Sequence, residues 1–89
     1  MPQAKQAKKR MRQDAERRLA NKGRSSAMKT AMKRVLNAVA QGDINEARRL
    51  LPIATKRIDK AAKQHVIHSN NAARKKSRLS RAINQLASA

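Results

Sequence analysis

The sequence predicts an all-α protein: a three-helix bundle with a long first helix whose basic N-terminal half projects as an arm. Three observations lead to this fold class. Ala, Lys, Arg, Gln and Leu dominate the chain, and all are good helix formers. Strand signals are missing, because period-two alternation is absent and Gly and Pro number only two each. Apolar residues instead recur at intervals of three and four, the spacing of one helix face.

The first helix is expected over about residues 5–41. Its second half carries one apolar face, made of Met28, Ala31, Met32, Val35 and Val39. Its first half carries a narrower stripe that lies roughly 140° away around the helix, made of Met11, Ala15 and Leu19. One straight helix cannot turn both stripes toward the same core.

Residues 1–24 are therefore predicted to form a basic arm, and residues 25–89 the helical bundle, within a single domain of residues 1–89. Nine of the twenty residues from 5 to 24 are Lys or Arg. Gly23 stands at the join, and a helix-interior glycine favours a bend or local softness there. A disordered basic tail is the alternative. We expect the arm to be frayed alone and helical when bound to a partner.

The second helix is expected to begin after Gly42, which suits the left-handed position that ends the first helix. Asp43 can cap the new helix, and Glu46 completes a variant of the capping box. Pro52 should kink this helix; a break into two helices is the alternative, but the apolar period continues across it. That period comprises Ala47, Leu50, Leu51, Ala54, Ile58 and Ala61.

Residues 64–69 are predicted to form the second connection, with Val66 and Ile67 as its apolar plug. Ser69 or Asn70 is the expected cap of the third helix. One side of that helix is apolar, with Ala72, Leu79, Ile83 and Leu86. The opposite side is basic, with Arg74, Arg78 and Arg81, while Lys75 and Lys76 flank the apolar stripe.

Charge is the strongest functional signal in the chain. Lys and Arg number 23 and Asp and Glu only 5, which gives a formal net charge of +18 on 89 residues. Such a charge opposes compaction and calls for a polyanion, with nucleic acid first and an anionic membrane surface second. No apolar run has the length of a membrane span or of a signal-peptide core.

The charge is unevenly divided. Net charge is +10 over residues 1–41, +3 over 42–64 and +5 over 65–89. The first and third helices are therefore predicted to bind, and the second mainly to complete the core. That core is expected to be thin, because Phe, Trp and Tyr are absent. The absence of cysteine excludes disulfides and thiolate metal sites, and a reducing interior such as the cytosol fits it.

The two histidines raise the question of a metal or catalytic site. His65 and His68 stand three apart, but further ligands or an oriented nucleophile are not visible, and Asp59 is the nearest carboxylate. The segment indicates a turn rather than a helix face. For His68 two interpretations stay open: packing of the turn against the core, or a polar or stacking contact to a nucleotide. Packing is favoured for His65.

The pattern favours backbone and shape recognition of folded RNA. Single-strand readers stack bases on aromatic side chains, which this chain lacks, and no short recognition helix for the DNA major groove is marked. Asn70 and Asn71 suit a helix start, where free amides can also bind phosphate. An architectural DNA-binding protein and a cationic membrane-active helix are the alternatives; an enzyme ranks last, because carboxylates are few and scattered.

Several segments together resemble the bacterial small-subunit ribosomal protein S20 family (bS20-type) over nearly the whole chain. They are AKKRMRQ, RRLANKGRSSAMKTAMKRV and AKQHVIHSNNAARKKSRLS. The most specific part is V-I-H-x-N-x-A-A-R-x-K-S-R-L, which runs from Val66 to Leu79. The chain departs from the family pattern at Gly23 and Ser25, where a non-glycine and a basic residue are expected. These departures bear on the stiffness of the helix and on one phosphate contact.

The resemblance implies a structural role without catalysis, cofactor, metal or small-molecule substrate. It implies direct binding to 16S ribosomal RNA, at its 5′ domain and long penultimate stem, and support of 30S assembly. It also implies a cytoplasmic location on the small ribosomal subunit, no membrane contact and few protein–protein contacts.

The expected RNA-binding residues fall into three groups. Those of the arm are Lys5, Lys8, Lys9, Arg10, Arg12, Arg17, Arg18, Asn21, Lys22 and Arg24. Those that continue the same face are Ser26, Lys29, Thr30 and Lys33. Those of the second patch are His68, Asn70, Arg74, Lys75, Ser77, Arg78 and Arg81.

Overall fold

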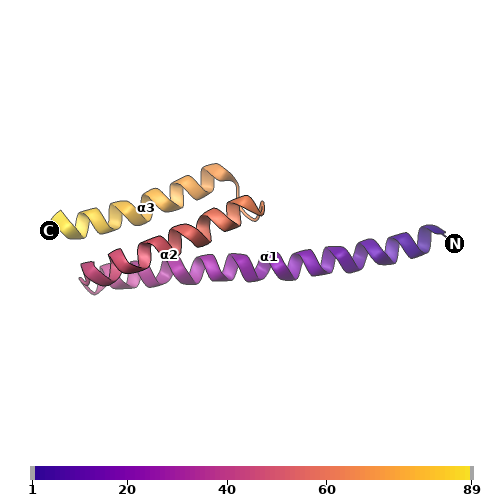
Figure 1. The fold of residues 1–89 in the computed structure, drawn as a ribbon, viewed down its shortest axis with the longest axis horizontal. Coiled ribbons are helices and arrows are strands. Elements are labelled where there is room, and N and C mark those ends of the chain that lie inside the picture. Colours follow the sequence, from indigo (N-terminus) through magenta and orange to yellow (C-terminus); the bar gives the residue numbers. More distant parts are fainter. Residues whose placement is uncertain (1, 89) are drawn as a thin grey trace.

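Three helices make up the part of the chain that the structure, a computed structural model, describes: the backbone from residue 2 to 88 and side chains from residue 6 to 88. Helix α1 spans Pro2–Ala40, α2 spans Ile44–Lys63 and α3 spans Ser69–Ser88. In Figure 1, α2 and α3 lie alongside only the C-terminal half of α1, and the N-terminal half continues past them. The predicted all-α bundle with a projecting first helix is confirmed.

The length of α1 determines the shape of the molecule. Its 39 residues span about 58 Å at 1.5 Å per residue. The molecule accordingly measures 67 × 21 × 15 Å, and its radius of gyration of 17.8 Å exceeds the roughly 12 Å of a compact chain of this size. The apolar stripe of the arm faces solvent, since Met11 is 72% and Leu19 74% exposed. Helix α1 is continuous through Gly23, the position at which the sequence suggested a bend or local softness.

The core is small and wholly aliphatic. It joins the C-terminal half of α1 to both other helices, and its largest fully buried side chains are Met28, Val35, Ile58 and Leu79. Most of the remaining buried members are alanines; the full set is Met32, Ala38, Ala47, Ala54, Ala61, Ala72 and Ile83. No polar side chain is buried among the described residues. Burial of each large side chain contributes about 1.5–3 kcal/mol, so the apolar period fixes which face of each helix turns inward.

The turn between α1 and α2 differs from the predicted capping box. Gly42 has φ 75°, and the amides of Gly42 and Asp43 donate to the carbonyls of Val39 and Ala38, so α1 ends in a Schellman motif. The Asp43 carboxylate caps α2 by accepting from the Glu46 amide at 3.1 Å. The reciprocal bond from the Asp43 amide to Glu46 does not form, because that amide is already used by Ala38.

Pro52 lies inside α2 without breaking it. The helix runs unbroken from Ile44 to Lys63, so the alternative of two short helices is wrong. Pro52 is exposed, while Ala54 and Ile58 on the other side are buried. The carbonyl that loses its helical partner to Pro52 therefore lies on the side where water can reach it.

The turn between α2 and α3 repeats the Schellman motif without a glycine. His65 occupies the left-handed position with φ 59°, and the amides of His65 and Val66 donate to the carbonyls of Ala62 and Ala61. Val66 and Ile67 pack half-buried against the core, as predicted. His65 itself is exposed, so the expectation that it fills the turn against the core is wrong.

His68, rather than Ser69 or Asn70, caps α3. Its carbonyl accepts the first helical bond, from the Ala72 amide, and its imidazole Nδ1 accepts from the Asn70 amide at 3.1 Å. Ser69 and Asn70 instead lie in the first turn of the helix. The His68 side chain is exposed, which also excludes its packing against the core.

A left-handed backbone at His65 predicts that His65→Gly stabilises the fold. A residue with a Cβ pays about 1–2 kcal/mol there, and glycine regains part of it after its larger loss of chain entropy. We expect the free energy of unfolding to rise by up to about 1 kcal/mol in urea titration. His65→Val should lower it, because a branched Cβ suits this conformation poorly. A less stable glycine variant would contradict the geometry.

Candidate nucleic-acid interface

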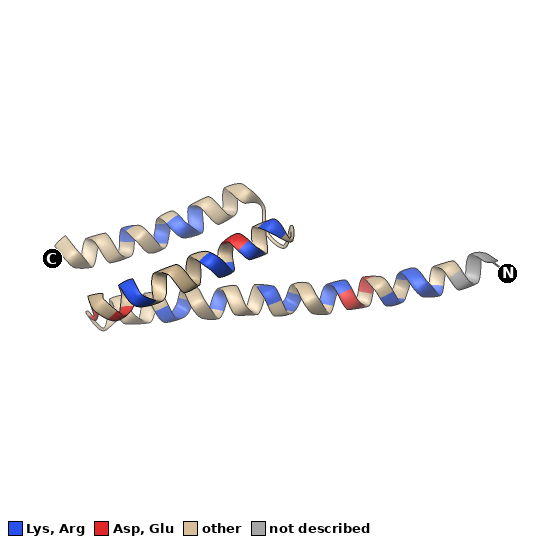
Figure 2. Cartoon of the chain, in the orientation of Figure 1, with Lys and Arg blue, Asp and Glu red and all other residues tan. Residues whose placement is uncertain are grey.

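Cations cover the length of α1 on the side that faces away from the core. At about 100° per residue, Lys8, Arg12, Lys22, Lys29 and Lys33 fall on one outward stripe, and all five are exposed. Figure 2 shows that Lys and Arg recur from the arm to the bundle. Other exposed residues among those predicted on this helix are Lys9, Arg10, Arg17, Arg18, Ser26 and Thr30. Lys5 lies outside the residues whose side chains the structure describes.

A second stripe follows the core-facing side of α1 past the end of the bundle. Arg10, Arg17 and Arg24 recur every seven residues and so drift by only about 20° per step. They lie in line with the buried Met28 and Val35. Where α2 and α3 no longer cover this face, it therefore changes from apolar to cationic. Arg24 is half-buried at the boundary, and its Nη1 donates to Asn21 Oδ1 at 3.2 Å.

Helix α3 contributes a third cationic stripe. Arg74, Ser77, Arg78 and Arg81 follow the i, i+3, i+4, i+7 pattern of one helix face, and all are exposed. They line a groove of about 620 Å³ that also includes Leu36 of α1. Lys75 is half-buried beside this stripe. The structure thus brings four predicted residues of the second patch together, and it leaves His68 and Asn70 at the start of the same helix.

The cap hydrogen bond limits the contacts that the His68 side chain can make to a nucleotide. Because Nδ1 accepts from the Asn70 amide, the neutral ring carries its proton on Nε2. Only the Nε2–H group and the ring face remain for a nucleotide.

Few carboxylates neutralise these surfaces. Within residues 6–88 two ion pairs form: Lys76 with Asp59 at 2.8 Å, and Arg49 with Glu46. Lys76 thereby ties α3 to α2. Hydrogen bonds from Arg49 hold the pKa of the exposed Glu46 carboxyl below its ordinary value. Neither ion pair involves a residue of the three cationic stripes. Within residues 6–88 the Lys and Arg side chains of these stripes therefore have no carboxylate partner and are available to a ligand.

The charge count per segment understated α2. Arg57 and Lys60, three residues apart on one exposed face, lie beside Arg24 of α1. Their i, i+3 spacing is visible in the sequence, but the neighbouring helix is not. Among the described residues no three His, Cys, Asp or Glu side chains gather closely enough to hold a metal ion. No helix between residues 2 and 88 combines the length and apolar character needed to cross a bilayer.

An elongated helical bundle with cationic stripes along two helices defines a class of protein that binds extended polyanions through its surface. Comparison with known proteins then gives the family. The model of the family described as ribosomal protein S20 matches residues 2–84. The chain belongs to this family, which makes it a structural protein of the small ribosomal subunit and not an enzyme. Ribosomal components work in the cytoplasm, which is where this membership places it.

Similar proteins from several bacteria agree with this assignment. The small ribosomal subunit protein bS20 of Natranaerobius thermophilus is 49% identical over 88 residues, covering 99% of this chain and 100% of the relative. The bS20 of Persephonella marina is 46% identical, covering 94% of this chain and 91% of its own. The bS20 of Bacillus licheniformis is 45% identical, covering 97% and 98%.

The cap of α3 predicts that His68 contributes to the stability of the fold. His68→Ala removes the acceptor for the Asn70 amide and should lower the free energy of unfolding by about 1 kcal/mol. His68→Asn supplies a side-chain oxygen and should restore most of it. Thermal unfolding followed by circular dichroism measures both. Equal stability of the wild type and the alanine variant would show that the hydrogen bond contributes nothing.

Proposed function

We propose that the protein binds 16S ribosomal RNA directly, at the 5′ domain and the long penultimate stem, and supports assembly of the 30S subunit. The observation that carries this proposal is the set of unpaired cationic stripes along a 67 Å molecule. Family membership gives the coarser role in the small subunit, and the charge geometry supports the finer one.

Charge neutralisation is the first part of the mechanism. A net charge of +18 repels itself in the free protein, and it releases condensed counterions when it meets phosphates. The exposed stripes of α1 and α3 place Lys and Arg where RNA backbones can approach without displacing any protein partner. Arg suits bidentate contacts to phosphate, and Lys acts as a flexible point charge.

Bracing is the second part. The arm carries cations on its outward side and, through Arg10 and Arg17, on its inward side, so RNA can lie against both. The bundle sets the direction of the arm, because α1 is one helix from Pro2 to Ala40. RNA segments held on different sides of such a rod are kept at a fixed separation. In this proposal residues 1–24 act as the arm and residues 25–89 as the bundle of one domain, with few protein–protein contacts.

The α3 stripe provides a direct test. We expect Arg74→Ala with Arg78→Ala to weaken binding to a transcript of the 5′ domain about tenfold or more, because two charge-assisted contacts to phosphate are lost. The slope of log affinity against log salt should become shallower by about two. Filter-binding titrations over a range of salt concentrations measure both quantities.

The matched control is Arg48→Ala with Lys56→Ala. It removes the same charge from exposed positions of α2 that line none of the grooves described above. The control should bind as the wild type does, and duplex DNA at the same salt should compete poorly. Unchanged affinity and slope in the Arg74/Arg78 variant would remove α3 from the interface. Equal competition by DNA would favour an architectural DNA-binding role instead.

A further inference from the structure

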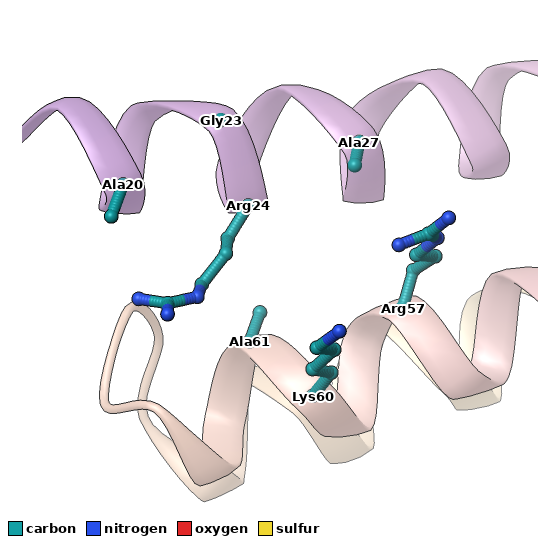
Figure 3. Close-up of a pocket in the computed structure, with 7 residues that line it drawn as sticks. All are labelled: Ala20, Gly23, Arg24, Ala27, Arg57, Lys60 and Ala61. Carbon is teal, nitrogen blue, oxygen red and sulfur yellow. The ribbon is translucent and has the colours of Figure 1, made fainter.

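A cavity of about 320 Å³ lies where the arm leaves the bundle, between α1 and the C-terminal part of α2. Figure 3 shows its lining: the Arg24 side chain extends from α1 toward α2, and Arg57 and Lys60 rise from α2 on the facing side. The three cations come from two helices and surround one space. None of them belongs to an ion pair among residues 6–88.

The rest of the lining consists of small residues. Ala20, Gly23 and Ala27 form the α1 side, and Ala61 points toward them from α2. A Cβ built on Gly23 would meet no protein atom within 4 Å, so the space beside this residue is open. A ligand at the edge of the cavity can therefore approach the α1 backbone closely at Gly23.

The chemistry of the lining selects the ligand. Arg and Lys side chains offer only hydrogen-bond donors, and the lining contains no carboxylate, amide or hydroxyl group. The backbone carbonyls of this region already accept hydrogen bonds within the helices. A nucleobase presents both donors and acceptors and would leave its donors unsatisfied here, and no aromatic side chain is present to stack on it. A phosphate only accepts hydrogen bonds, and its negative charge is opposite to that of the three cations.

Arg24 is held ready for such a contact. Its guanidinium donates to Asn21 Oδ1 at 3.2 Å through Nη1, which leaves its other N–H groups free. The side chain is half-buried, so less rotamer freedom is lost when a ligand binds. This bond also gives Asn21 a positioning role within the arm.

We propose that this cavity seats a backbone phosphate of the RNA, held jointly by Arg24, Arg57 and Lys60, so that α2 takes part in RNA binding. The proposal rests on the RNA-binding function proposed above and adds a site to it. A phosphate bound here would link the base of the arm to the bundle. It would also reduce the repulsion among the three like charges that the fold brings together.

The test compares two double variants of the full chain on a transcript of the 5′ domain. Arg57→Ala with Lys60→Ala should weaken binding about tenfold or more and make the salt slope shallower by about two. Arg48→Ala with Lys63→Ala removes one Arg and one Lys from exposed positions of the same helix outside the cavity. This control should bind as the wild type does. Equal affinities of the two variants would overturn the proposal.

Gly23→Leu tests the space rather than the charge. Leucine favours helix over glycine, and its Cβ would meet no protein atom within 4 Å, so the unfolding temperature of the free protein should stay the same or rise. Because Gly23 lines the cavity, the added side chain would reduce the room for a phosphate, and RNA affinity should fall several-fold. Unchanged or tighter binding would overturn the proposal. If no phosphate bound in the cavity, the only effect of leucine would be a stiffer arm, which does not weaken RNA binding.

The outcomes also separate this site from the wider function. A wild-type protein that does not prefer the ribosomal transcript over duplex DNA would contradict the proposed function itself. A wild-type protein that does prefer it, with both double variants and Gly23→Leu binding normally, would contradict the cavity alone. An acidic peptide as the true occupant would produce this second pattern.

Discussion

The packing of α2 and α3 onto the C-terminal half of α1 is the constraint on which the rest of the structure depends. The core holds no aromatic side chain, and its large buried members are Met28, Val35, Ile58 and Leu79. So few side chains must hold together a chain with a net charge of +18. The structure meets this conflict by gathering apolar residues over half of α1. The cations lie outside that core, where phosphates can neutralise them.

Two tight turns allow the three helices to pack around this small core. Both interhelical connections use the same Schellman hydrogen bonds, with Gly42 in one and His65 in the other, and the three helices therefore lie side by side with short links. Because the bundle ends at the second turn, the inward face of α1 changes there from core to Arg17 and Arg10. One continuous helix thus serves as a structural element at one end and as a binding element at the other. The cavity bounded by Arg24, Arg57 and Lys60 lies at this boundary.

The sequence predicts the helices and their buried faces well, because burial follows a local period that needs no knowledge of the partner helix. The exposed Met11 and Leu19 were predicted in the same way, from a stripe that points away from the core face. Helix ends were predicted less well. The left-handed His65 lacks the glycine that signals such a position, and the cap at His68 uses an imidazole instead of the usual Ser or Asn. The Glu46 half of the capping box failed because the Asp43 amide bonds backward to Ala38. The meeting of α2 cations with Arg24 depends on tertiary packing, which charge counts along the chain cannot reveal.

The central claim is that the arm and the bundle together hold the backbone of one region of folded RNA. Backbone cleavage footprinting on small-subunit ribosomal RNA, with and without the protein, tests it most directly. The account predicts protection concentrated in the 5′ domain and on the long penultimate stem, and weakening together as salt rises. Protection scattered over unrelated sites, with none in the 5′ domain, would contradict it.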